Sequence, residues 1–223
     1  MDSWLQRLVV RGVPADVAAF EKAAASPSKP EYLYQRAQLR TQRLSFVKLR
    51  AALPSRLADG IDEPQEPWDL FIEKPKRFRD GSLETTYRFQ LSEFEPENLI
   101  AAVSGLYPRL TFVLGTVAPD ADEQSSLLAH AGKVWRWWIS KRLKESICAK
   151  IPEDTEDNGD EVFWQLVEAD SKMMDVVIDH WKEKVGRVIA QINRDTKASD
   201  DRSSPKTSWD RISKNHRKSR EAR

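Results

Sequence analysis

The sequence contains very little of what covalent, metal or cofactor chemistry requires. It has one cysteine, Cys148, so no disulfide can form within the chain and a reducing compartment is expected. Its three histidines are scattered, and no His-x-x-x-His or Cys-x-x-Cys pair occurs. The eight glycines form no phosphate-binding cluster, and there is no Gly-x-Ser-x-Gly motif. We therefore expect no metal, no cofactor and no enzymatic activity.

Long apolar runs are missing as well. No stretch approaches the eighteen consecutive apolar residues of a membrane-spanning helix, and the N-terminal residues Met1–Trp4 show no basic region followed by an apolar one. These absences predict a cytoplasmic protein that neither spans a membrane nor is secreted.

Charge is unevenly distributed, although the net charge is only +1. Residues 197–223 hold nine Lys or Arg against four Asp or Glu, a net +5, which leaves −4 for the 196 residues before them. This segment has few large apolar side chains, so it is predicted to be a disordered basic tail in isolation.

Apolar periodicity is clearest between Thr85 and Leu114. Tyr87, Phe89 and Leu91 alternate with polar residues, as in a strand with one buried face. A helical stripe follows up to about Leu106, and a second alternating run begins at Leu110. The pattern predicts two parallel strands joined by a right-handed crossover, whose helix covers one face of a sheet.

The N-terminal half supplies the remaining elements of the sheet. The pattern predicts a strand up to Gly12, a helix opened by Pro14, and strands at 44–49 and 68–72. Asp80-Gly81 is a pair typical of a hairpin turn leading into the Thr85 strand. This order predicts an α+β fold of the ferredoxin-like (split β-α-β) type, an antiparallel sheet with helices on one face.

The same residues resemble a known family. The similarity runs through Trp4 and the strand up to Gly12, the helix from Pro14, Leu44-Ser45-Phe46 and Trp68 to the later positions Phe89, Pro96, Leu99, Tyr107-Pro108 and Leu110-Thr111-Phe112. Over about the first 115 to 140 residues the chain resembles the ferredoxin-like domain of plasmid- and phage-borne YubB-type proteins. Leu5 and Arg7 stand where that family typically has cysteine and asparagine, and Phe94 replaces a tryptophan. The resemblance implies the fold and a mobile-genetic-element context.

Two interpretations are open for residues 122–150. Ser125–His130 and Lys133–Ile139 flank Ala131-Gly132 and are compatible with a hairpin followed by a helix at 141–150. The alternative is one continuous helix from Asp122 to Lys150. Gly132 and the β-favouring run after it favour the hairpin.

Further on, Val162–Val167 suggests a short helical element, and Asp170-Ser171 looks like the start of a long helix to about Arg194. Its apolar stripe offers four residues as candidates for contact with a partner protein, namely Met174, Val177, Trp181 and Val188. The predicted organisation is a domain at 1–140, a helical C-terminal extension at 141–196 and the basic tail.

Three basic features are candidates for nucleic-acid binding, because cations neutralise phosphates and exposed indoles stack on bases. The predicted hairpin contributes Lys74, Lys76, Arg77 and Arg79; a Trp/Arg segment contributes Lys133, Trp135, Arg136, Trp137, Lys141 and Arg142; the tail contributes Lys214, Arg217, Lys218 and Arg220. Each also has a simpler interpretation: a solvated turn, indoles packed between the sheet and the C-terminal helices, and a terminus without a partner.

The leading hypothesis is a non-enzymatic accessory protein of a mobile genetic element that binds nucleic acid. The competing hypothesis is a protein-interaction module that uses the apolar face of the long helix.

Overall fold

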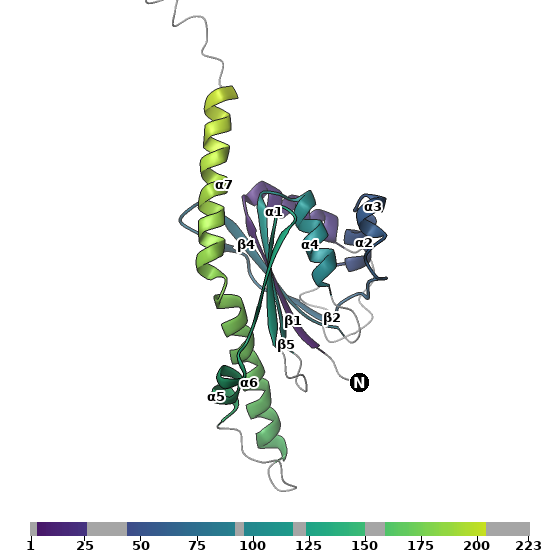
Figure 1. The fold of residues 1–223 in the computed structure, drawn as a ribbon, viewed down its shortest axis with the longest axis vertical. Coiled ribbons are helices and arrows are strands. Elements are labelled where there is room, and N and C mark those ends of the chain that lie inside the picture. The colour runs from purple at the N-terminus through teal and green to yellow at the C-terminus, as the bar shows by residue number, and fades with distance from the viewer. Residues whose placement is uncertain (1–3, 26–43, 92–95, 118–123, 150–158, 204–223) are drawn as a thin grey trace, which may run out of the picture. The chain divides into compact units, whose positions relative to one another are not determined.

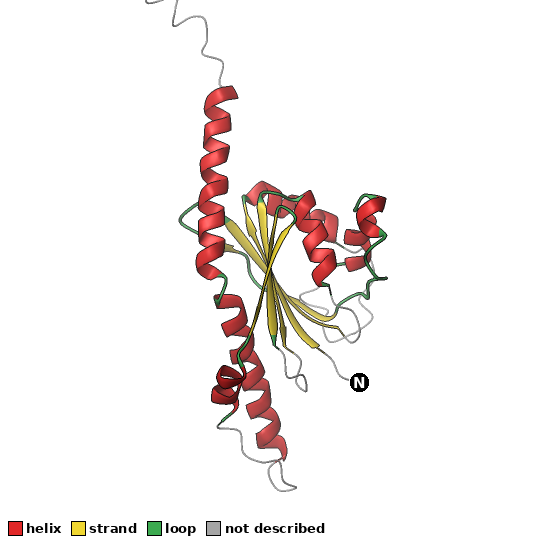
Figure 2. Ribbon diagram, viewed as in Figure 1, coloured by secondary structure: helices red, strands yellow, loops and turns green. Residues whose placement is uncertain are grey.

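A computed structural model describes residues 4–25, 44–91, 96–117, 124–149 and 159–203 of the chain. The described part consists of α-helices and a seven-stranded antiparallel sheet, an α+β fold (Figures 1 and 2). The strands are β1 (Trp4–Gly12), β2 (Trp68–Ile72), β3 (Lys76–Arg77), β4 (Leu83–Leu91), β5 (Leu110–Val117), β6 (Ser125–His130) and β7 (Lys133–Trp138).

The strand order is β2-β4-β1-β5-β6-β7, and the short β3 also pairs with β4. Both β4 and β5 are antiparallel to β1, so they run parallel to each other with β1 between them. The predicted pair of parallel strands is therefore confirmed, although the two strands are not neighbours.

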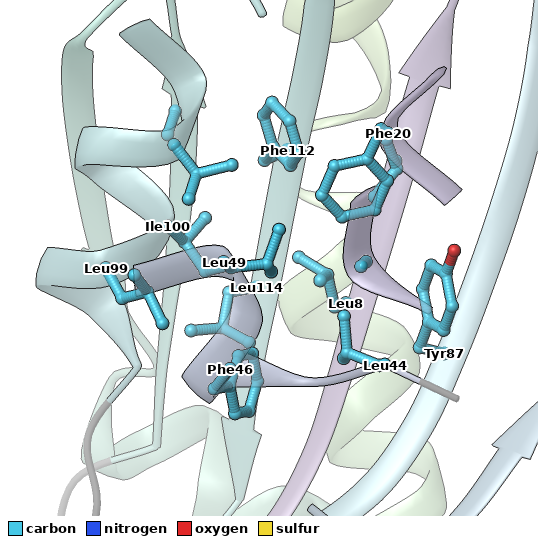
Figure 3. Close-up of a cluster of buried hydrophobic side chains, with 14 of the residues drawn as sticks. Leu8, Phe20, Leu44, Phe46, Leu49, Tyr87, Leu99, Ile100, Phe112 and Leu114 are labelled. Atoms are coloured by element: carbon cyan, nitrogen blue, oxygen red, sulfur yellow. The ribbon is translucent and has the colours of Figure 1, made fainter. Parts of the chain in front are cut away.

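Four helices lie on the side of one face of the sheet, which we call the first face (Figure 1). They are α1 (Pro14–Ala24), α2 (Phe46–Ala51), α3 (Ser55–Ala58) and α4 (Glu97–Leu106), and α3 is the one farthest from the strands. Alternate residues of the strands meet these helices in the main hydrophobic core, as Figure 3 shows for Leu8, Phe20, Phe46, Leu99, Phe112 and Leu114. Each such side chain contributes about 1.5–3 kcal/mol to stability when fully buried, so this core stabilises the packing of the helices on the first face.

The predicted strand at 44–49 is wrong, because residues 46–51 form helix α2. Ser45 caps this helix by accepting a hydrogen bond of 3.1 Å from the backbone N–H of Lys48. Phe46 and Leu49, three residues apart, are then buried together on one side of the helix. A short apolar run satisfies strand and helix patterns equally, and here the cap and the packing favour the helix.

The hairpin interpretation of 125–139 is confirmed, and the single helix from 122 to 150 is wrong. Strands β6 and β7 pair antiparallel around Ala131 and Gly132, whose φ angles of 48° and 76° lie in the left-handed region. Glycine adopts that region without steric cost, so Gly132 permits the tight turn. The predicted helix after the hairpin is present as α5 (Lys141–Cys148).

The other face of the sheet, the second face, is packed against helix α6 (Gly159–Asp179) (Figure 1). Gly115 of β5 allows this contact: a Cβ atom there would lie 2.7 Å from Met174 Sδ and 3.0 Å from Val177 Cγ2. Met174, Val177 and Trp181 are buried within the chain. Their assignment to a partner surface is therefore corrected, whereas Val188 is half-buried.

The predicted long helix is also corrected at both ends. Helix α6 passes through Asp170-Ser171 without a break and ends at Asp179; His180-Trp181 form a turn, after which α7 (Lys182–Ser203) begins. The backbone N–H of Trp181 bonds the carbonyl of Ile178, three residues back, at 3.1 Å. Its indole Nε1 donates to Ser126 Oγ at 2.8 Å, so the break is fixed to strand β6.

The chain divides into two units, residues 1–189 and 190–223. The sheet, helices α1–α6 and the first turns of α7 belong to the first unit. Within the described residues, no helix combines the length and the apolar character needed to cross a membrane.

Candidate functional site

Three arginines project from the second face of the sheet. Side chains alternate along a strand, so Leu8 and Val10 of β1 enter the core while Arg7 and Arg11 lie on the opposite side. Arg88 of β4 is paired with Arg7 in the antiparallel register, and Gly115 of β5 is the neighbour of Arg7 on the other side. The register therefore brings two guanidinium groups next to each other.

These arginines line a groove with a volume of about 480 Å³. Its floor is formed by β1, β4 and β5, including Val9, Thr86 and Val113. The β2–β4 region supplies one wall, and the end of α6 with the start of α7 supplies the other; the wall residues are Glu73, Lys76, Phe78, Asp175, Ile178, Asp179, Lys182 and Val185. The groove thus combines three arginines with apolar and hydroxyl-bearing side chains on its floor, and both walls carry charged and apolar residues.

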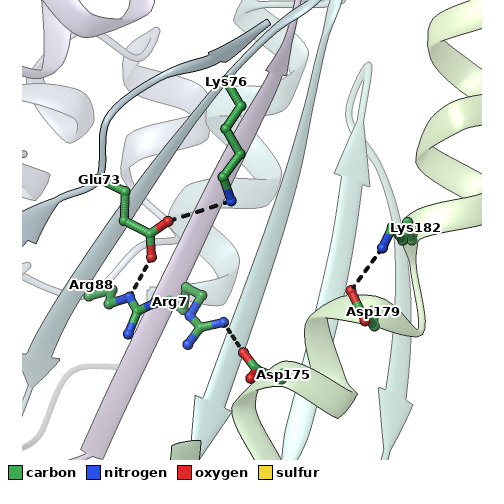
Figure 4. Close-up of polar contacts among 7 residues, drawn as sticks. All are labelled: Arg7, Glu73, Lys76, Arg88, Asp175, Asp179 and Lys182. Carbon is green, nitrogen blue, oxygen red and sulfur yellow. Dashed lines mark hydrogen bonds and ion pairs between the residues drawn. The ribbon is translucent and has the colours of Figure 1, made fainter. Parts of the chain in front are cut away.

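Ion pairs run across the groove (Figure 4). Arg7 Nη1 lies 2.6 Å from Asp175 Oδ1 of α6, and Arg88 Nε lies 2.6 Å from Glu73 Oε1. Lys76 Nζ reaches the other oxygen of Glu73 at 3.7 Å. Figure 4 shows the order Glu73, Arg88, Arg7, Asp175, so the two guanidinium groups lie between two carboxylates.

Arg11 is held more completely than Arg7. Its Nε donates to Ser82 Oγ at 2.9 Å, its Nη2 contacts Asp80 Oδ2 at 2.8 Å, and its guanidinium lies 3.5 Å from the ring centre of Phe78. Burial by itself raises the pKa of Asp80, but hydrogen bonds from Ser82 and the charge of Arg11 outweigh burial and lower that pKa. This cluster fixes the hairpin to β1.

Glu84 of β4 also lines the groove, and it is paired in register with both Arg11 and Lys76. Burial raises its pKa, and the neighbouring Glu73 raises it further, while Arg11, Lys76 and Lys182 oppose the shift. Desolvation therefore outweighs the nearby cations at this position.

The structure brings some of the predicted nucleic-acid residues to one end of the sheet. The pairings Lys76–Glu84, Glu84–Arg11, Arg11–Thr111, Thr111–His130 and His130–Lys133 form one row across the strands. Lys74, Arg77, Arg79 and Lys133 are exposed at this end, while Lys141 and Arg142 are exposed on α5, which follows the other end of β7.

Strand alternation divides the Trp/Arg segment between the two faces. Trp135 and Trp137 pair with Leu128 and Ser126 and contact the α6–α7 region: Lys184 Nζ lies 4.0 Å from the ring centre of Trp135, and His180 stacks on Trp137 at 4.2 Å. Arg136 points to the first face, where its Nε lies 2.8 Å from Glu97 Oε2 of α4. Both indoles are thus already in contact with α6–α7 side chains.

The sequence-based prediction missed Arg7 and Arg11 as candidate site residues. The available signal was the alternation Arg7-Val9-Arg11 in a strand whose other residues are core, which places cations on the face away from the core. Trp138, the third indole of the Trp/Arg segment, is 51% exposed. Lys214, Arg217, Lys218 and Arg220 lie outside the described residues.

Among the residues that the structure describes, no group of three or more His, Cys, Asp or Glu is arranged to hold a metal ion. No protein-family model matches the chain, and no curated protein and no solved structure matches it either.

Proposed function

We propose that this protein is a non-enzymatic nucleic-acid-binding accessory protein of a mobile genetic element, with the β3–β4 hairpin as its main contact. The observation that carries the proposal concerns Lys74, Arg77 and Arg79. Lys74 lies between β2 and β3, Arg77 belongs to β3, and Arg79 lies in the turn that follows; all three are exposed, and none forms an ion pair with another described residue. Cations without a carboxylate partner are available to neutralise phosphates.

The hairpin is built to present these cations in a fixed position. The N–H of Phe78 bonds the carbonyl of Ser82 at 3.0 Å, and Gly81, at φ 82°, closes the turn back to Phe78 at 3.0 Å. Arg11 anchors Asp80 and stacks on Phe78. A fixed basic turn at the end of a sheet suits contact with a phosphate backbone, because little side-chain and loop freedom is lost on binding.

The proposed function includes a ferredoxin-like fold. With α2, α3, β3 and the β6–β7 hairpin taken as additions, the path β1-α1-β2-β4-α4-β5 and the sheet order β2-β4-β1-β5 support a ferredoxin-like arrangement. The mobile-element context rests on the sequence resemblance, and a cytoplasmic location is part of the same proposal.

Fluorescence anisotropy with labelled single- and double-stranded DNA and RNA tests this function. The hairpin variant carries Lys74→Gln, Arg77→Gln and Arg79→Gln, and the matched control carries Lys133→Gln, Lys141→Gln and Arg142→Gln. Both variants lose three exposed positive charges. We expect the hairpin variant to lose at least about tenfold in affinity at low salt and to show a shallower salt dependence, because each phosphate contact contributes roughly −0.9 to the log–log slope.

The control should lose much less affinity than the hairpin variant. Equal losses in the two variants would mean that net charge alone governs binding. The absence of any binding by the unaltered protein at low salt would sink the proposed function.

A protein partner remains the second candidate. The sequence-predicted contact residues Met174, Val177 and Trp181 are buried within the chain. Trp164 and Val167, three residues apart on α6, are instead 67% and 43% exposed. Residues three apart on a helix lie on the same side and can present one apolar surface. Concentration-dependent sedimentation would detect self-association through this surface.

A further inference from the structure

We propose that Arg7 and Arg88 form a binding site for a compact oxyanion, the phosphate or carboxylate group of a small molecule, on the second face of the sheet. The site is separate from the basic hairpin turn. Its two cations are positioned by strand register rather than by a loop.

Two like charges directly opposite each other on one face of a sheet destabilise that sheet. Arg7 and Arg88 are such a pair in the β1–β4 register. Each guanidinium has one carboxylate on its outer side, Asp175 for Arg7 and Glu73 for Arg88. In Figure 4 the two guanidinium groups lie next to each other with Glu73 and Asp175 on their outer sides, and an anion placed between them would relieve their repulsion.

The hydrogen bonding of Arg7 is incomplete. Its side chain is only 10% exposed, and its Nε is buried without a hydrogen-bond partner among the described residues. A guanidinium has five N–H donors, and the described partner of Arg7 is the single carboxylate oxygen of Asp175. A buried cation in this state is costly, so the unused donors favour an oxyanion ligand.

The surroundings leave room for a ligand on both sides of this pair. Arg7 and Arg88 line the groove of about 480 Å³ and also a second cavity of about 300 Å³ beneath α6. The second cavity is lined by Leu5, Val167 and Met174, among other residues. A ligand whose oxyanion lies at the arginines can therefore place an apolar part against these side chains.

Arginine suits this chemistry because its planar fork matches the two oxygens of a carboxylate or phosphate. Glu73 and Asp175 each occupy only part of a fork: Glu73 is bonded to Arg88 Nε, and Asp175 to Arg7 Nη1. The remaining Nη groups are the ones that would hold the ligand. Asp175 is 64% exposed in its side chain, so it can move aside as an anion enters.

Isothermal titration calorimetry at constant ionic strength tests the site with four probes, namely inorganic phosphate, phenyl phosphate, acetate and benzoate, against a chloride blank. The test variant is Arg88→Gln. The control is Arg136→Gln, which removes a closely matched pair on the first face: Arg136 bonds Glu97 through Nε at 2.8 Å and is 42% exposed, against 2.6 Å and 49% for Arg88.

We expect the unaltered protein to bind at least one probe saturably. Its affinity should be at least about tenfold weaker in Arg88→Gln, because a hydrogen bond to a charged group is worth about a factor of ten or more. In Arg136→Gln the affinity should change by less than about twofold. The variant Arg7→Lys keeps the charge but removes the fork, so it should weaken binding as well. If circular dichroism shows that Arg7→Lys does not fold, the comparison of Arg88→Gln with Arg136→Gln is sufficient to test the site.

The probes also separate the two ligand sources: preference for the phosphates assigns a phosphate ester, and preference for the carboxylates assigns a carboxylic acid. Tighter binding of the phenyl compounds than of phosphate or acetate shows that an apolar part of the ligand adds to the affinity. No saturable binding of any probe, or equal weakening by Arg88→Gln and Arg136→Gln, overturns the proposal. The hairpin variant should bind the probes normally, so this site and the nucleic-acid function can fail independently.

Discussion

At the scale of single residues, Gly115 decides how the second face is covered. Every other position of β5 carries a side chain, and most of them are buried. Only the missing Cβ at Gly115 lets Met174, Val177 and Ile178 of α6 approach the strand. The glycine is therefore needed for space, since its φ angle is not in the left-handed region.

We predict that Gly115→Ala lowers the free energy of unfolding by about 1–3 kcal/mol, because overpacking forces the helix or the strand to shift. Urea denaturation followed by far-UV circular dichroism measures the change. Gly186→Ala is the control: it lies within α7 with no atom within 4 Å of the added Cβ, so it should raise stability by about 0.5–1 kcal/mol. A neutral Gly115→Ala would show that α6 does not pack as closely as described.

Single residues also limited the sequence-based prediction. Ser45 becomes a helix cap only because Phe46 and Leu49 are buried together, and the local pattern alone fits a strand as well. Asp170-Ser171 has the composition of a cap but lies inside α6. Capping residues identify a helix start only where the following residues are not already helical.

At the scale of elements, the turn between α6 and α7 is fixed by the β6–β7 hairpin. Trp181 bonds Ser126 of β6, and His180 stacks on Trp137 of β7 with an interplanar angle of 10°. Lys184 of α7 lies over Trp135. The Trp/Arg segment of the sequence therefore holds two helices in place, which is the packing interpretation for Trp135 and Trp137.

His180 in this turn makes the free energy of unfolding depend on pH. Burial and the neighbouring Lys184 lower the pKa of His180 from its ordinary value of 6.5. The unfolded chain then binds a proton at higher pH than the folded chain does, so the contribution of His180 to stability is fully present above about pH 6.5 and is lost as the pH falls towards the lowered value.

We expect His180→Gln to reduce the loss of unfolding free energy between about pH 7.5 and pH 5 relative to the unaltered protein. Urea denaturation at the two pH values measures it. The exposure of His180 makes the effect small, because solvent screens the shift. An identical loss in the variant and the unaltered protein would assign the acid sensitivity to other groups.

At the scale of the whole molecule, the cations of the sheet fall into two groups that differ in whether they form ion pairs. The β3–β4 hairpin and the residues just before it carry exposed cations that form no ion pair with a described residue, while the second face carries arginines held in ion pairs. Beyond the described residues, the sequence adds seven Lys or Arg and two Asp or Glu in residues 204–223. Removing these residues changes the net charge from +1 to −4.

We predict that a chain ending at Ser203 binds DNA more weakly at low salt and with a shallower salt dependence, because fewer counterions are released. Anisotropy titrations over a range of salt concentrations measure both quantities. Combining the truncation with the hairpin variant should give additive losses if the two basic regions act independently. An unchanged affinity after truncation would restrict binding to the folded part.

The sequence by itself determined the strands at 68–72, 85–91 and 110–114, the helices starting at Pro14 and ending near Leu106, and the exposed cations of the hairpin turn. These features depend on short-range periodicity, glycine and proline, which act within a few residues. The tertiary structure decided the rest: the six-strand order, the burial of the Met174, Val177 and Trp181 stripe, and the pairing of Arg7 with Arg88. Register and face depend on contacts between residues far apart in the chain, and a local turn pattern predicts neighbouring strands only within a hairpin such as β6–β7.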